Sequence, residues 1–146
     1  MVNAPPGAVD LVPEFDISDM AQSLDFYVRL LGFAVLYDRP EHEFAYLGLG
    51  SAQIMIHPRS RWQTGKLEKP FGRGINFQIN VPDLAALLAR LEAAGWPLFQ
   101  PPEERWDRRH GEDLGVRQFQ VQDPDGYLLR FSQRLGLRPE PPAGQR

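Results

Sequence analysis

The sequence contains no cysteine, which excludes disulfide bonds, a thiolate nucleophile and cysteine metal ligands. It has no apolar run near the roughly 18 residues that a membrane span requires. Residues 1–10 have neither the cationic start nor the apolar stretch of a signal peptide. A formal charge of −3 is not the basic excess typical of nucleic-acid binders. We therefore expect a cytoplasmic protein with no membrane or nucleic-acid partner.

A hairpin at residues 118–133 is the clearest pattern that the chain does have. Polar and apolar residues alternate on both sides of Asp123-Pro124-Asp125-Gly126, where proline and glycine suit a tight turn. One face is polar because Gln118 and Gln120 alternate with Phe119 and Val121. We expect this face to meet water or a ligand.

The chain repeats one pattern with a period of about 63 residues, the spacing of Gly32 and Gly95, each of which should end a helix. The first half is predicted to contain a strand at 11–18, a helix capped by Ser18 or Asp19, and strands at 33–38, 44–49 and 52–57. The second half is predicted to contain a strand at 75–81, a helix at 84–94, a strand near 97–101, a polar loop at 106–115 and the hairpin.

These elements predict an α+β fold of two βαβββ modules, whose curved mixed sheets form a cleft on the faces away from the helices. The modules are residues 11–58 and 73–135, joined by a linker loop at 59–72. Residues 1–10 and 136–146 are predicted to be a flexible arm and a flexible tail. Strand alternation gives the expected cleft lining: Val12, Glu14, Gln53, Met55, His57, Asn76, Gln78, Gln118, Gln120, Leu128 and Arg130.

Two stretches resemble motifs of the vicinal oxygen chelate superfamily, which includes glyoxalase I, extradiol dioxygenases and bleomycin resistance proteins. They are residues 23–33, which contain Ser-Leu-Asp-Phe-Tyr and Leu-Gly-Phe, and residues 123–131. His57-Pro58, together with Leu128-Leu129-Arg130, is most similar to the bleomycin resistance branch. The resemblance implies a homodimer in which each cleft is shared by one module from each subunit.

Metal enzymes of this superfamily carry their ligands at positions that match Val12, Met55, Asn76 and Arg130. None of these side chains is a usual ligand for the ions expected there. We therefore predict no metal, no cofactor and no catalytic residue. A displaced metal site at Glu14 and His57 remains a minor alternative, since a histidine at a strand end is more often only hydrogen-bonded locally.

The candidate ligand contacts are polar groups in the cleft and aromatic side chains at its rim. Glu14 and Arg130 form either a salt bridge or a recognition pair. Aromatic residues at the rim either stack on a flat ligand or cover their own module's core. We expect contacts from Glu14, Tyr46, Gln53, Met55, His57, Trp62, Asn76, Gln78, Trp106, Gln118, Gln120 and Arg130, whereas Phe33 and Trp96 are predicted to lie in the core and His42 and His110 in solvent.

The favoured function is a metal-free protein that sequesters a planar polar or cationic compound, such as a glycopeptide antibiotic, in a homodimer. The alternatives are a metal-dependent lyase, transferase or dioxygenase of the superfamily, and an enzyme that uses the cleft without a metal. Function varies widely on this fold, so the choice among these functions depends on the residues of the site.

Overall fold

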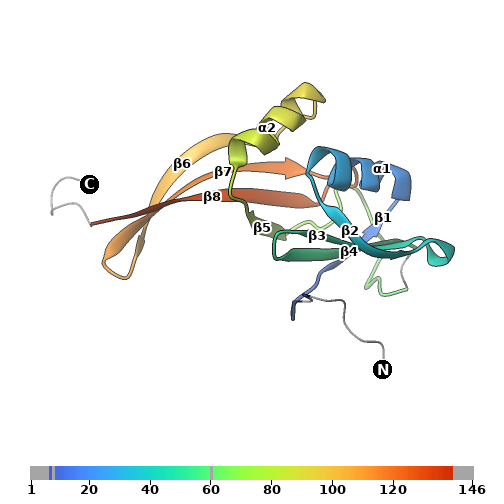
Figure 1. The fold of residues 1–146 in the computed structure, drawn as a ribbon. Helices are drawn as coiled ribbons and strands as arrows, with labels where there is room; N and C mark the ends of the chain where they lie inside the picture. Colours follow the sequence, from blue (N-terminus) through green and yellow to red (C-terminus); the bar gives the residue numbers. More distant parts are fainter. Residues whose placement is uncertain (1–6, 8, 60, 140–146) are drawn as a thin grey trace.

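The computed structural model describes residue 7, residues 9–59 and residues 61–139 (Figure 1). The first half comprises β1 (Glu14–Ile17), α1 (Met20–Leu24), the π-helix η1 (Asp25–Leu30), β2 (Ala34–Arg39), the 3-10 helix η2 (Pro40–His42), β3 (Phe44–Leu49) and β4 (Ala52–Pro58). The second half comprises β5 (Asn76–Asn80), α2 (Leu84–Ala93), β6 (Gln100–Arg109), β7 (Glu112–Gln122) and β8 (Leu128–Pro139).

Each half forms one mixed sheet. Sheet A has the strand order β1-β4-β3-β2, and sheet B has the order β5-β8-β7-β6. The first strand of each half pairs in parallel with the last, and the other pairs are antiparallel. The predicted α+β fold of two βαβββ modules is confirmed. Figure 1 shows the helices of both modules on the same side of the two sheets. In the described ranges, no helix is long and apolar enough to cross a membrane.

Equivalent local signals start and stop the helices of the two modules. Asp19 and Asp83 are the N-caps, and their carboxylates accept hydrogen bonds from the backbone amides of Gln22 at 2.8 Å and Ala86 at 3.1 Å. Gly32 and Gly95 follow the helical segments with positive φ values of 86° and 66°. Of the two predicted caps for the first helix, Asp19 is therefore the one used.

One hydrophobic core runs through both modules. The ring of Phe15 on β1 stacks on Tyr127 at 4.5 Å between ring centres and lies 4.9 Å from Phe77 on β5. Phe33 is buried and Trp96 packs against the same core, as predicted. Arg90 on α2 donates a hydrogen bond to the carbonyl of Leu30 at 2.9 Å, so the helical segments are also joined. The modules therefore form one packed unit.

The turn between β7 and β8 fastens the second module to the first. Asp123 accepts a hydrogen bond of 2.7 Å from the buried hydroxyl of Tyr27, and Ser18 donates to Asp125 through its hydroxyl at 2.5 Å. Burial raises the pKa of Asp123 to about 6, although the hydrogen bond from Tyr27 favours the ionised form. Burial, followed by the neighbouring Asp123 charge, raises the pKa of Tyr27 well above its usual value.

The end of the linker is held against this same turn. The backbone amide of Phe71 donates to the carbonyl of Asp125 at 2.8 Å. Lys69 lies 3.6 Å from the carboxylate of Asp125. A side chain at Gly126 would place its Cβ 2.5 Å from the backbone of Pro70, and the φ of Gly126 is +100°. Only glycine fits this close approach.

The predicted polar loop at 106–115 is wrong, because β6 and β7 continue through it and turn only at His110 and Gly111. Figure 1 shows these strands extending with β8 beyond α2. Both faces of this arm are largely exposed, so charged residues replace the apolar alternation that identifies a half-buried strand. β8 also reaches Pro139, so the predicted tail begins inside a strand, and residues 140–146 lie outside the described part.

Candidate functional site

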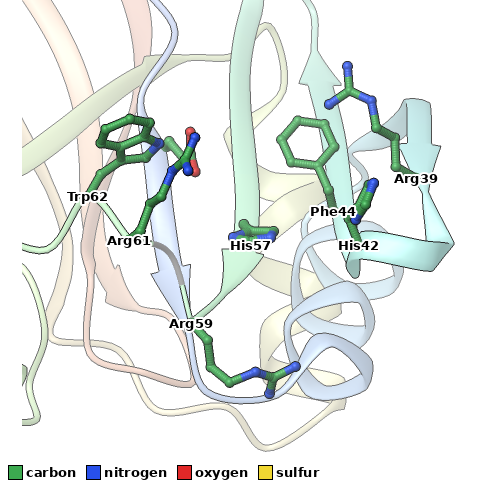
Figure 2. A pocket seen from close by; sticks show the side chains of 8 residues that line it. Arg39, His42, Phe44, His57, Arg59, Arg61 and Trp62 are labelled. Carbon is green, nitrogen blue, oxygen red and sulfur yellow. The ribbon is translucent and has the colours of Figure 1, made fainter.

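The main candidate site is a pocket of about 570 Å³ on the face of sheet A away from the helices (Figure 2). Its walls come from strands β1 to β4, the corner between β2 and β3, and the start of the linker. We call it the arginine pocket; its lining is Glu14, Arg39, His42, Phe44, His57, Arg59, Arg61 and Trp62.

Strand register places the pocket side chains on one face. Glu14 lies opposite Met55 and Asp16 lies opposite His57 in the parallel pairing of β1 and β4. Phe15, between the two carboxylates, points into the core and is buried. The rings of Phe44 and His57 lie 6.3 Å apart at the floor. The predicted open face for Glu14, Met55 and His57 is therefore the observed one.

Arginine side chains lie over aromatic rings on both sides of the pocket. The guanidinium carbon of Arg39 is 4.8 Å from the ring centre of Phe44, and that of Arg61 is 4.8 Å from the ring centre of Trp62. Figure 2 shows Arg61 and Trp62 on one side of His57, with Phe44, His42 and Arg39 on the other. Arg59 forms an ion pair with Glu43.

Tyr46 and Gln53, two predicted ligand contacts, interact with other residues of the chain. Tyr46 stacks on Tyr37 at 4.8 Å and donates a hydrogen bond of 2.7 Å to Gln53. Gln53 in turn donates to the carbonyl of Gly7 at 2.8 Å, which holds the described part of the amino-terminal arm. Burial, with a smaller contribution from Tyr37, raises the pKa of Tyr46. The rest of that predicted arm, residues 1–6 and residue 8, lies outside the described residues.

Asn76 and Gln78 lie apart from the arginine pocket. With Gln53 they line a smaller pocket of about 280 Å³ at the junction of the two modules, where Leu11, Pro13 and Phe77 provide apolar walls. Val12, predicted to line the cleft from the first strand, precedes β1. The predicted single cleft is thus divided within one chain.

Sheet B presents the remaining predicted contacts, and its predicted glutamines donate hydrogen bonds to polar side chains of the same sheet. Gln118 donates to Glu103 at 3.1 Å, and Gln120 donates to Gln100 at 2.7 Å. Gln78, the third predicted glutamine of this face, donates to Asn80 at 3.0 Å. Arg130 lies opposite both Gln78 and Gln120 in the sheet. Its Nε is buried and has no hydrogen-bond partner among the described residues.

Two predicted interactions do not occur in the chain. Trp106 faces the opposite side of sheet B, since it pairs with Gly115, and its ring lies 4.1 Å from the guanidinium carbon of Arg138. It therefore does not rim the cleft. Glu14 and Arg130 lie on different sheets, and no ion pair joins them within the described residues.

Comparison with known proteins identifies the family. A family model described as the Glyoxalase/Bleomycin resistance protein/Dioxygenase superfamily matches residues 16–131. The chain belongs to this superfamily. A superfamily member from Vibrio splendidus 12B01 is 36% identical, with 84% of this chain and 95% of that chain covered and a TM-score of 0.41.

Two more distant structures share the fold. A virulence protein from Salmonella typhimurium is 20% identical, with 86% of this chain and 98% of that chain covered and a TM-score of 0.62. A glyoxalase-related enzyme from Fulvimarina pelagi is 23% identical, with 86% and 87% covered and a TM-score of 0.61. Comparison with curated proteins gave no match. The bleomycin resistance branch is not distinguished from the rest of the superfamily by these relatives.

The residues of this superfamily member do not fit the metal that the fold implies. Valine, methionine, asparagine and arginine occupy the positions predicted for ligands, at Val12, Met55, Asn76 and Arg130. Within the described ranges, no group of three or more His, Cys, Asp or Glu side chains is placed to hold an ion. Glu14 and His57 do line one pocket, but its arginines would repel a cation.

The arginines and Phe44 were not predicted to line a site. His42 is exposed, as predicted, and it also lines the arginine pocket. Arg39 and His42 flank the β2–β3 corner, while Arg59 and Arg61 directly follow β4. Basic residues just beyond the strand that carries His57 were the available signal. Their meeting depends on how the linker folds over sheet A, which periodicity does not report.

Proposed function

We propose that this superfamily member binds a small flat compound in the arginine pocket, holds no resident metal, and releases the compound chemically unchanged. One observation carries the proposal: side chains unsuited to a metal occupy the superfamily's ligand positions, while the neighbouring pocket combines aromatic rings with hydrogen-bond donors. Phe44 and Trp62 provide stacking surfaces, and the arginines and His57 provide donors. Such a lining supports recognition of a ligand.

Sequestration of an antibiotic is one form of this proposed function. The sequence-based prediction included both planar polar and cationic compounds, with glycopeptides as an example. The charges lining the pocket distinguish these two classes. The lack of cysteine supports a proposed location in the cytoplasm, where thiols are kept reduced and structural disulfides are rare.

A metal-dependent lyase, transferase or dioxygenase is the alternative function. One structural relative is described as a glyoxalase-related enzyme, but at 23% identity it supports the fold only. The donors of this chain argue against the alternative, because among the described residues no group of three or more His, Cys, Asp or Glu side chains is placed to hold an ion. Glu14 and the two histidines of the arginine pocket lie among three arginines, which would repel a cation.

We also propose that two chains pair, so that sheet A of one copy and sheet B of the other close a shared cleft. The superfamily resemblance supports this arrangement, because in bleomycin resistance proteins each cleft is shared by one module from each subunit, and the predicted cleft is divided within one chain here. Sedimentation equilibrium should give the mass of a dimer, and a monomer at micromolar concentration would refute the shared cleft.

The binding proposal is tested by titration calorimetry against bleomycin-type drugs and a panel of flat aromatic compounds. Mass spectrometry of each compound recovered from the protein then shows whether it has changed. We expect saturable binding of at least one compound and an unaltered mass. Protein purified without a metal-affinity tag should contain no stoichiometric Zn, Ni, Mn or Fe. A chemically altered ligand, or a stoichiometric metal, would refute the proposal.

A further inference from the structure

We infer that the arginine pocket takes an organic anion with a flat apolar body, such as an aromatic carboxylate, sulfonate or phosphate ester. The inference rests on the proposed function and specifies the charge of the ligand. It excludes the cationic compounds that the sequence-based prediction included beside planar polar ones.

The charges around the pocket have the opposite sign to the charge of the whole chain. Three arginines line it, at positions 39, 59 and 61, and the single lining carboxylate is Glu14. The chain as a whole has a formal charge of −3. The positive potential is therefore a local property of this surface, and a cleft lined by one sign of charge concentrates ligands of the other sign.

Two of these arginines have no ion-pair partner among the residues that the structure describes. Arg59 pairs with Glu43, whereas Arg39 and Arg61 form no ion pair with any described carboxylate. Each instead lies over a ring, Arg39 over Phe44 and Arg61 over Trp62. A guanidinium that stacks through its face keeps the N–H groups on its edge for another partner. Those edges match a carboxylate, sulfonate or phosphate group, which accepts two hydrogen bonds side by side.

The aromatic side chains of the pocket specify the other part of the ligand. Phe44 and His57 form a floor of two rings 6.3 Å apart, and the side wall carries the indole of Trp62, which is 70% exposed. A volume of about 570 Å³ lies within the range for small-molecule sites. A flat ring system can therefore lie against the aromatic surfaces while its acidic group meets the arginines.

A matched set of probes separates charge from shape. The probes are 2-naphthoate, 2-naphthamide and 2-naphthylmethylammonium, which share one ring system and differ in charge. Calorimetry with the full chain at low salt should show that 2-naphthoate binds at least about tenfold more tightly than the amide and that the cation binds weakest. The affinity for 2-naphthoate should fall as salt is raised, because exposed charges are screened.

Substitution of the stacked arginines locates the effect. Arg61→Gln and Arg39→Gln should each weaken 2-naphthoate by about tenfold and leave the amide within about twofold, since only the anion uses the guanidinium. Arg29→Gln is the matched control: it removes the same charge from an exposed arginine that pairs with Asp25 outside the pocket. It should leave 2-naphthoate affinity unchanged. Circular dichroism checks that all three variants are folded.

The possible outcomes separate the two proposals. If the amide or the cation binds as tightly as 2-naphthoate, or if Arg29→Gln is as harmful as Arg61→Gln, the anion inference is wrong and the binding function stands. If none of the three probes binds at millimolar concentration, the pocket does not accept flat aromatic compounds, and the proposed function fails together with the inference.

Discussion

Sheets A and B have the same strand connections but opposite ways of satisfying the polar groups on their open faces. On sheet B, side-chain amides bond to groups on the same sheet, as in the pair Gln120 and Gln100. On sheet A, Arg39 and Arg61 lie on aromatic rings without a carboxylate partner among the described residues. In one copy of a repeated module, the polar groups of the open face can thus be satisfied within the sheet. In the other copy, they can remain available to a ligand.

This difference between the open faces originates in segments outside the equivalent strands of the two modules. The linker after β4 and the corner between β2 and β3 supply four arginine-pocket residues beyond the strand faces: His42, Arg59, Arg61 and Trp62. In the second module, β6 and β7 instead continue as a long hairpin away from the helices (Figure 1). Loop length has therefore made a pocket in one half and an arm in the other.

The two modules share one hydrophobic core, so they should unfold together. Phe15→Ala tests this, and it should have the largest effect on stability of the substitutions considered. Phe15 is fully buried between Tyr127 and Phe77, so its removal should lower the free energy of unfolding by about 4 kcal/mol. Urea unfolding followed by circular dichroism and by tryptophan fluorescence should give one shared transition. Phe15→Leu, the milder variant, should cost about 1.5 kcal/mol. Two separate transitions would show that the modules are independent.

The contact of Asp123 with Tyr27 predicts how stability depends on pH. The folded carboxyl group keeps its proton up to a pKa of about 6, whereas its ordinary value is 3.8. The folded state therefore binds more protons in this range, and the free energy of unfolding should fall as pH rises from about 4 to about 6, by at most about 3 kcal/mol. Urea titrations across this range measure it.

Asp123→Asn is the control for this pH effect. Its amide cannot titrate but can still pair with the Tyr27 hydroxyl, so the difference between the variant and the natural chain isolates one group. An equal pH dependence in both proteins would assign the effect to other carboxylates.

Paired substitutions on the two open faces test their division of roles. Trp62→Ala should weaken 2-naphthoate by about tenfold, or about 1.4 kcal/mol, because stacking area is lost. Gln120→Ala on sheet B should change the same affinity by less than about twofold, since its amide is bonded to Gln100. Calorimetry on both variants measures the two losses of affinity. A larger loss for Gln120→Ala would mean that the ligand binds to sheet B and not in the arginine pocket.

The helix caps should give the smallest effect and the same one in both modules. Asp19→Ala and Asp83→Ala each remove a carboxylate that accepts from a first-turn amide, at 2.8 Å and 3.1 Å. Each should cost about 1 kcal/mol in the free energy of unfolding. Thermal melts of the two variants should nearly coincide. A cost confined to one cap would mean that the halves differ in their helices as well.

The module architecture was predictable because its signals are local. The caps Asp19 and Asp83 and the helix-ending Gly32 and Gly95 act within one turn of chain, and alternation along β1 and β5 identifies the core face. The same alternation correctly placed Glu14, Met55 and His57 on one face. That these side chains contact a ligand remains a prediction.

The site was less predictable because its parts meet only through tertiary structure. β6 was expected to end near Pro101, so Glu103 was not expected alongside Gln118. Gln100 lies within the predicted strand, but its contact with Gln120 depends on the register of β6 and β7. The mixed polar sequence at 106–115 has no apolar face because the arm has no core beneath it. Arg39 and Arg61 are far apart in sequence and lie in one pocket only after the linker folds back.

The close approach of Gly126 to Pro70 has a consequence for dividing the chain. The linker is fastened to the second module from Lys69 onward, while Gly65 and Lys66 are exposed and a Cβ at Gly65 would meet no atom within 4 Å. Phe15, Tyr27 and Ser18 of the first module remain bonded to or packed against the second. A backbone break between Gly65 and Lys66 should therefore leave two fragments that need each other's surfaces to fold and assemble as complementing halves of one protein.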